Sequence, residues 1–176
     1  MSVASPTWLE INLSAVTGNC AHLLHDTGTP LMAIVKGDAY GHGAPEVARA
    51  AVAGGATWLG VARFGEARGL RQQGLRAPIL VMGMVTAAEV DEAGGRVIDG
   101  LYSHLAAAEA PHPLNDLQIA RFQAAVSALE AHGLRPRWVH LANSAAAFAW
   151  PQARYDLVRV GNVVLGLRIR LDQPLP

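Results

Sequence analysis

The sequence predicts an α/β protein with a parallel sheet, built either as an open sheet or as an incomplete (β/α) barrel of about six strands. Short apolar runs alternate with Ala-rich helical segments along almost the whole chain, a rhythm typical of βαβ units. Several of the helical segments end at glycine, as helices commonly do. An eight-stranded barrel usually needs about 200 residues or more, whereas this chain has 176.

The first elements follow from local pattern. Residues 8–13 (WLEINL) alternate loosely and predict a short strand, and residues 14–25 predict a helix with Ser14 as its N-cap. The run at 31–36 (LMAIVK) is apolar up to its final lysine, which suits a strand buried on both faces of a parallel sheet. The glycine-punctuated segment 37–43 is expected to be a loop.

The same rhythm then repeats to the end of the chain. Ala-rich or amphipathic segments predict further helices at 44–53, 64–73, 86–93, 115–132 and 144–149. Runs rich in apolar residues predict further strands at 58–62, 79–83, 99–105, 138–144 and 157–166. With the strand at 31–36, this makes six barrel-type strands.

Composition excludes several classes of function. The 14 basic and 14 acidic residues cancel, so no charge imbalance favours nucleic acid or an acidic membrane surface. No apolar run reaches the roughly 18–20 residues of a membrane span, and the N-terminus lacks the pattern of a signal peptide. A single cysteine, Cys20, rules out an internal disulfide and fits a cytoplasmic protein. Unclosed sheet edges would favour a homodimer that covers them.

A lysine at the end of an apolar strand is the first chemical signal. Lys36 would be partly desolvated there, which lowers the pKa of its amine and prepares it to form a Schiff base. The alternative is a lysine whose amine extends from the strand end into solvent. Tyr40, in the glycine-rich segment that follows, could donate its hydroxyl to a phosphate or simply pack within the loop.

Three more polar clusters end predicted strands, where active sites of α/β folds assemble. His140, Asn143 and Ser144 precede a predicted helix, where free N–H groups bind anions, although Ser144 as a plain N-cap is the alternative. Arg159 interrupts an apolar strand and needs a partner, either a carboxylate or a ring nitrogen. Gly161, beside Asn162, would let a ligand approach the backbone. The fourth cluster holds His104, for which a structural role is the favoured interpretation.

These motifs resemble the alanine racemase family. IVKGDAYGHG (34–43) resembles the cofactor-lysine signature of that family, and GLYSHLAAAE (100–109), HLANSAA (140–146) and YDLVRVGNVVLG (155–166) match further family segments in the same order. The opening WLEINLSAVTGN is similar as well. The resemblance covers nearly the whole chain and implies a TIM-type barrel that uses pyridoxal 5'-phosphate to interconvert L- and D-alanine, which supplies D-alanine for the cell wall.

The resemblance also implies roles for matching residues. Lys36 would hold pyridoxal phosphate covalently and act as one of two acid/base groups at the substrate Cα. Tyr40 and Ser144, next to Asn143, would bind the phosphate together with the backbone at Gly161 and Asn162. Arg159 would donate to the pyridine nitrogen, and His140 would orient Arg159. Because an arginine stays protonated, the nitrogen that faces it stays unprotonated, which favours racemisation over transamination.

The sequence departs from the family in ways that predict impaired activity. Between Met84 and Asp99 there is room for one helix, so two βα units, or roughly 60 residues, are missing. We expect residues 1–176 to be one shortened barrel domain, with residues 1–13 as an N-terminal strand segment and residues 167–176 opening a C-terminal β domain that is missing. In the family, that domain supplies the tyrosine that serves the opposite face of the substrate, usually across a dimer interface. Tyr40, Tyr102 and Tyr155 do not match its motif.

Two other interpretations remain open from sequence. One is a non-catalytic barrel that carries pyridoxal phosphate and resembles the single-domain homeostasis proteins of this cofactor. The other is an α/β domain without a ligand, because six strands need not close into a barrel.

Overall fold

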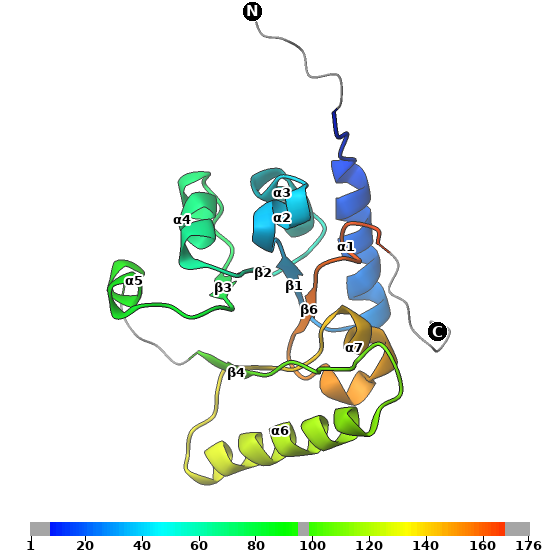
Figure 1. Ribbon diagram of the computed structural model, residues 1–176, viewed down its shortest axis with the longest axis vertical. Coiled ribbons are helices and arrows are strands. Elements are labelled where there is room, and N and C mark those ends of the chain that lie inside the picture. The colour runs from blue at the N-terminus through cyan, green and yellow to red at the C-terminus, as the bar shows by residue number, and fades with distance from the viewer. Residues whose placement is uncertain (1–7, 95–98, 168–176) are drawn as a thin grey trace, which may run out of the picture.

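The computed structural model describes residues 8–94 and 99–167, and in that part of the chain six parallel strands form two sheets (Figure 1). One sheet has four strands in the order β3-β2-β1-β6, and the other pairs β4 with β5. The strands are β1 (Leu31–Ile34), β2 (Trp58–Val61), β3 (Ile79–Val81), β4 (Gly100–Tyr102), β5 (Trp138–His140) and β6 (Val158–Val160). All six lie inside the predicted strands and are shorter than predicted.

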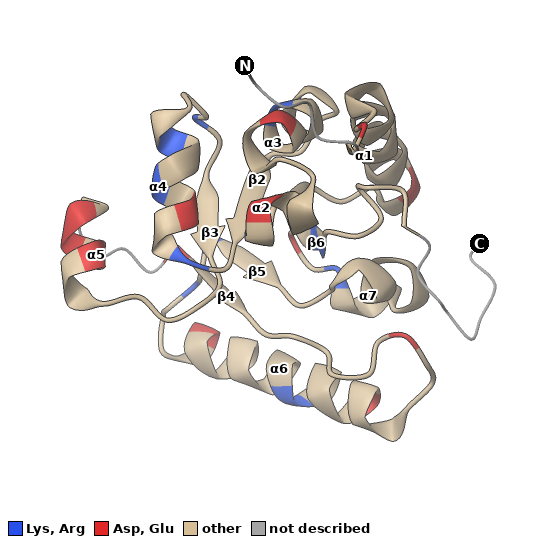
Figure 2. Ribbon diagram, turned by 45° about the horizontal axis from the view of Figure 1, so that its top comes forward, with Lys and Arg blue, Asp and Glu red and all other residues tan. Residues whose placement is uncertain are grey.

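Helices connect the strands, and the longer ones pack on the outer face of the sheets. They are α1 (Leu13–Thr27), α2 (Lys36–Gly41), α3 (Ala44–Ala53), α4 (Phe64–Gln72), α5 (Ala87–Glu92), α6 (Pro113–Ala131) and α7 (Ser144–Ala149), with a short 3-10 turn at Pro151–Ala153. None of the described helices is both long and apolar enough to cross a membrane. Figure 2 shows basic and acidic residues of both signs dispersed over the helices.

The N-terminal segment corrects two predictions. Residues 8–12 form no strand within the described chain, and Trp8 is 82% exposed. The side chain of Asn12 instead caps α1, because its Oδ1 accepts the N–H of Ala15 at 3.0 Å. The cap therefore lies two residues before Ser14, the predicted cap, and the helix begins at Leu13. Residues 1–7 of the predicted N-terminal segment, and 168–176 of the predicted domain start, lie outside the described residues.

The strands separate an inner from an outer apolar layer. In β1, Leu31 and Ala33 pack against the helices, whereas Met32 and Ile34 point to the other face. There they join Leu157, and Trp58, Leu80, Met82 and Trp138 pack around them. Burial on both faces explains why β1 is apolar at every position. Arg159 of β6 lies in register with Met32, which brings β6 beside β1 although the two strands lie far apart in the sequence.

The two sheets are joined on one side and open on the other. On the joined side, Arg159 donates its backbone N–H to the carbonyl of Ala142, just after β5, at 3.1 Å. On the other side, β3 and β4 form no ladder in the described chain, and the Tyr102 hydroxyl bridges them by donating to the Met82 carbonyl at 3.0 Å. The edge-to-face pair Trp58–Trp138 also connects the sheets, with ring centroids 5.8 Å apart. Within the described residues the fold is thus a six-stranded parallel barrel with an unpaired seam between β3 and β4, while β5 and β6 are joined by backbone hydrogen bonds without forming a ladder.

Candidate functional site

A pocket of about 380 Å³ lies where the C-terminal ends of the strands meet. A cavity of this size suits a small cofactor. Seven of the predicted cofactor-binding residues line it: Lys36, Tyr40, Asn143, Ser144, Arg159, Gly161 and Asn162. The eighth, His140, is 4% exposed and contacts Arg159. The structure therefore brings together all the residues that the sequence singled out, while their roles stay predictions.

Lys36 enters an unusual left-handed turn. The four residues from Gly37 to Tyr40 all have φ between 52° and 61°, with ψ between 34° and 48°, which is the left-handed helical region. Three of them carry side chains, and each such residue is destabilised by roughly 1–2 kcal/mol in this conformation. The segment 37–43 was predicted to be a loop. Its first part instead forms one strained helical turn. That turn places Lys36 at its start and Tyr40 at its end, and both face the pocket.

Lys36 is exposed, contrary to the predicted partial desolvation. The buried part of the strand region ends at Val35, and Lys36 lies one residue further, on the rim of the open pocket. Lys36 is also the only lysine among the 176 residues, the other 13 basic residues being arginines. Any chemistry that requires a lysine amine in this chain must therefore occur here.

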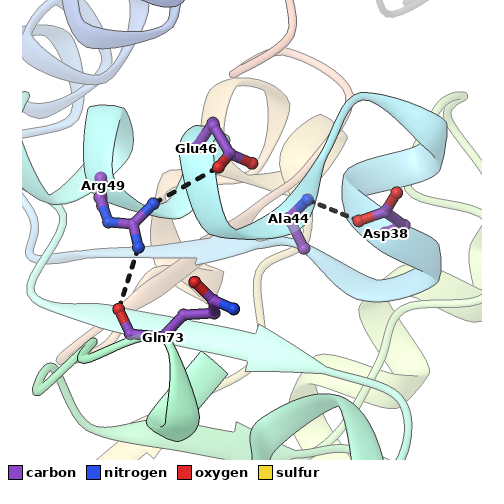
Figure 3. Close-up of polar contacts among 5 residues, drawn as sticks. All are labelled: Asp38, Ala44, Glu46, Arg49 and Gln73. Carbon is purple, nitrogen blue, oxygen red and sulfur yellow. Dashed lines mark hydrogen bonds and ion pairs between the residues drawn. The ribbon is translucent and has the colours of Figure 1, made fainter. Parts of the chain in front are cut away.

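Carboxylates hold the left-handed turn from both ends. Asp38 accepts the N–H of Ala44 at 2.7 Å and so fixes the start of α3 (Figure 3). Glu66, in the first turn of α4, accepts the N–H of Gly37 at 2.6 Å. Figure 3 also shows that Arg49 of α3 binds the carbonyl of Gln73, which joins α3 to the end of α4. These contacts offset part of the strain, since hydrogen bonds to charged groups contribute about 1.5–3 kcal/mol each.

Arg159 is a buried cation whose partners are mostly backbone carbonyls. It is 3% exposed, and its Nη1 donates to Nδ1 and the carbonyl of His140 at 2.9 and 3.2 Å. Its Nη2 donates to the carbonyls of Ser103 at 2.7 Å and Leu141 at 3.0 Å. Burial lowers the pKa of Arg159 to about 10, so the guanidinium remains charged at neutral pH. Tyr102 covers it, with the guanidinium carbon 5.3 Å from the ring centroid.

The contact with Arg159 determines the state of His140. Because Arg159 can only donate, Nδ1 of His140 must accept, which places any ring proton of the neutral form on Nε2. Burial and the charge of Arg159 lower the pKa of His140 to about 4. The imidazole is stacked on Tyr102, with ring centroids 5.3 Å apart and planes 5° apart. His140 is thus a neutral support that fixes one side of the guanidinium.

His104 lies on the pocket wall beside Arg159. Its Nδ1 is 3.4 Å from Nη2 of Arg159, and its Nε2 is 3.5 Å from Nδ2 of Asn143. Burial lowers the pKa of His104, and the charges of Arg159 and Lys36 lower it further, whereas Glu109 opposes them. The sequence favoured a structural role for His104 and did not indicate that its side chain faces the pocket.

The start of α7 and the turn after β6 form one corner of the pocket. Asn143 caps α7, because its Oδ1 accepts the N–H of Ala146 at 3.0 Å, and this frees Ser144 from the capping role. The Ser144 hydroxyl instead accepts the N–H of Gly161 at 3.1 Å. The hydroxyl of Tyr40 packs so close to Gly161 that a Cβ there would collide with it. Two hydroxyls and a backbone N–H therefore converge, as a phosphate site requires.

The donor set of the pocket fits pyridoxal phosphate. Among the described residues, the four N–H bonds of Nη1 and Nη2 of Arg159 have acceptors, whereas Nε has none. That Nε–H is suited to an aromatic ring nitrogen, which is an acceptor without charge. An exposed amine on Lys36 suits an aldehyde, and the corner at Ser144 suits a phosphate.

Sequence reasoning missed several contributors. Glu66 supports the turn of Lys36, and its only signal was a Glu at the N3 position of a predicted helix. Tyr102 lies in the segment GLYSHLAAAE, yet nothing in the pattern indicated that it covers Arg159. The carbonyls of Ser103 and Leu141 give no sequence signal at all, because every residue has one.

The chain matches one protein family over almost its entire described length. The family described as "Alanine racemase, N-terminal domain" matches residues 11–98 and 87–169. The alanine racemase of Symbiobacterium thermophilum is 35% identical over 223 positions, covering 92% of this chain and 59% of the relative. That of Salinispora arenicola is 34% identical, covering 90% and 60%. The chain therefore spans about 60% of the length of these relatives.

Part of the difference in length is internal. Since 92% of this chain is about 162 residues, about 60 of the 223 aligned positions of the Symbiobacterium relative have no counterpart here. The two matched segments meet around residues 87–98, between β3 and β4. This confirms the predicted internal deletion and places it at the unpaired seam of the barrel.

Solved structures give the same result. The alanine racemase of E. faecalis superposes with a TM-score of 0.86 at 28% identity, covering 100% of this chain and 64% of that chain. The alanine racemase of Bacillus anthracis, solved with bound L-Ala-P, superposes with a TM-score of 0.84 at 28% identity, covering 100% and 63%. The predicted TIM-type barrel is confirmed, with six strands in the part of the chain that the structure describes.

Proposed function

The chain belongs to the family of alanine racemase N-terminal domains, and from this membership we propose that it binds pyridoxal 5'-phosphate through Lys36 as an alanine racemase-type isomerase of impaired activity. The observation that carries the proposal is one pocket that holds the chain's only lysine, the free Nε–H of a buried arginine among the described residues, and a hydroxyl-lined corner. The cofactor supplies an electron sink that acidifies the Cα proton of a bound amino acid.

Different residues of the chain would hold the cofactor and transfer the proton. Lys36 would hold the aldehyde of the cofactor through Nζ and, once the amino group of the substrate has taken its place, would accept or return the Cα proton on its own face. Arg159 would donate to the ring nitrogen and stay charged, while neutral His140 keeps its guanidinium in place. Tyr40, Ser144 and the turn at Gly161 and Asn162 would orient the phosphate.

Inversion at Cα needs a proton to leave from one face and arrive at the other. The three tyrosines of this chain are engaged elsewhere: Tyr40 packs on Gly161, Tyr102 binds the Met82 carbonyl, and Tyr155 packs edge-to-face on Phe122. These contacts support the proposal that conversion of L- to D-alanine by this chain is slow.

Two measurements test the proposal. Mixing the chain with pyridoxal phosphate should give the absorbance of a lysine-bound cofactor, and borohydride reduction should add one cofactor mass to the peptide that contains Lys36. An adduct confined to the N-terminal amine, or none, would refute cofactor binding. Conversion of L-alanine should fall orders of magnitude below that of a full-length racemase, and comparable turnover would refute the impairment.

A second candidate is a non-catalytic carrier of the same cofactor. The unpaired seam between β3 and β4 favours it, because the internal deletion there removes two βα units from the wall of the pocket. A Lys36 adduct together with no measurable racemisation, even at high protein concentration, would select this function over the first. In either case we propose that the protein is cytoplasmic. Its ligand would be a small amino acid in the first case and the cofactor alone in the second.

A further inference from the structure

We propose that Glu66 is a positioning residue that sets Lys36 relative to Tyr40, and this inference rests on the proposed function. Glu66 lies outside every motif that indicated the cofactor site. Its carboxylate links the segment after β1 to the segment after β2 through three backbone N–H groups.

The two oxygens of the Glu66 carboxylate have different partners. Oε1 accepts the N–H of Gly37 at 2.6 Å, while Oε2 accepts the N–H groups of Ala62 and Arg63 at 2.8 and 2.9 Å. The last two contacts anchor Glu66 at the end of β2, whose ladder with β1 is fixed in register. The anchored carboxylate then holds the peptide group that directly follows Lys36.

The turn depends on this contact because its own hydrogen bonds do not reach its first peptide. Ala39 donates to the carbonyl of Val35 at 2.9 Å, and Gly43 donates to that of Asp38 at 3.0 Å, which secures the middle and the end. In the described chain, the N–H of Gly37 has Glu66 as its acceptor. Without it, the strained left-handed segment can relax at the point where Lys36 leaves the strand.

Such relaxation would change the distance between two groups that must act on one ligand. Lys36 and Tyr40 lie at opposite ends of the turn and both line the pocket. A rigid turn lets an aldehyde that carries a phosphate engage both groups at once. A loosened turn would still leave an accessible amine, but the phosphate would contribute less to binding.

The experiment compares two aldehydes on the full chain. Pyridoxal phosphate and pyridoxal, which lacks the phosphate, are titrated against wild type, Glu66→Gln and Glu66→Ala, with trapping by borohydride and mass analysis at Lys36. The matched control is Glu89→Ala, because Glu89 holds the same N3 position on α5, caps its helix through Thr86 and lies far along the chain from Lys36. Hydrogen exchange of the peptide covering residues 35–43 is measured without any aldehyde.

We expect Glu66→Ala to weaken pyridoxal phosphate binding about tenfold or more, by the free energy of a hydrogen bond to a charged group, and to weaken pyridoxal binding about twofold or less. Glu66→Gln, which keeps one acceptor oxygen, should lie between wild type and Glu66→Ala. Exchange over residues 35–43 should accelerate in both Glu66 variants and stay unchanged in Glu89→Ala.

Equal loss for the two aldehydes, or unchanged exchange in Glu66→Ala, would overturn the inference, since either would mean that Glu66 supports the fold without setting the turn. If wild type gives no Lys36 adduct with pyridoxal phosphate, the proposed function fails. The exchange measurement still decides whether Glu66 holds the turn, because it uses no ligand.

Discussion

At the residue scale, the site is organised around a buried cation without a carboxylate partner among its contacts. Arg159 is surrounded by carbonyls, a neutral imidazole and an aromatic ring. Each of these groups accepts or tolerates positive charge without neutralising it. The guanidinium of the arginine can therefore donate a hydrogen bond to an uncharged acceptor. The histidine beside it must stay neutral in order to accept from the guanidinium.

The state of His140 makes the fold sensitive to acid. Its pKa is about 4 in the folded chain, against about 6.5 when unfolded. The unfolded state binds more protons between these values, so the stability is present above pH 6.5 and is lost as the pH falls toward 4. Wild type should lose about 2 kcal/mol more between pH 7 and pH 5 than His140→Gln, whose amide oxygen can still accept from Arg159.

Urea unfolding at pH 7, 6 and 5 measures this difference directly. The His140→Gln variant retains every other titrating group, including His104 and the carboxylates, so their contribution cancels in the comparison. Parallel loss of stability in the two proteins would show that His140 is not held neutral by Arg159.

At the element scale, the sequence predicted the presence of strands well and their ends poorly. All six predicted barrel-type strands are found, because an apolar run flanked by helices has few alternatives in an α/β fold, whereas the short strand predicted at 8–13 is not formed in the described chain. The strand predicted at 157–166 ends at Val160, since Gly161 to Gly166 form turns. Apolar side chains there pack against the core from a turn, and hydrophobicity alone does not distinguish the two cases.

The left-handed turn at Gly37–Tyr40 was beyond prediction for a different reason. Three of its four residues have side chains that disfavour positive φ, so local propensity argues against the conformation. Contacts from Glu66, distant in sequence, override it. The members of the candidate site were predicted from motif and resemblance, while the carbonyls and the carboxylate that support them needed the fold.

Replacing glycine by alanine should change the stability in opposite directions at two glycines of the helices. Gly69 lies inside α4, where an added Cβ would meet nothing within 4 Å, so Gly69→Ala should stabilise the chain by about 0.5–1 kcal/mol. Gly28 ends α1 with φ of 61°, so Gly28→Ala should destabilise it by about 1 kcal/mol. Thermal and urea unfolding give both values, and a stabilising Gly28→Ala would contradict the assigned left-handed cap.

At the scale of the whole molecule, the two sheets share one core. Val139 of β5 and Leu105 after β4 belong to the same buried cluster as Leu31 and Val158 of the larger sheet. An unpaired seam therefore does not divide the structure into independent units. The internal deletion lies between β3 and β4 and leaves the packing of the core continuous.

We accordingly expect one cooperative unfolding transition. Fluorescence of the Trp58–Trp138 pair reports on the contact between the sheets, and far-UV circular dichroism reports on the helices. Their urea midpoints should coincide in a Trp8→Phe variant, which removes the most exposed tryptophan. Two separated midpoints would mean that the smaller sheet, β4 with β5, melts on its own.

The pairing of β1 with β6 governs when the site can exist during synthesis. The register that sets Met32 beside Arg159 joins positions more than 120 residues apart, a separation that slows folding because a long loop must close first. A nascent chain that extends only through β5 carries Lys36 but lacks the guanidinium of Arg159. The site that we propose for the cofactor is thus complete only once β6 has been made and has paired with β1.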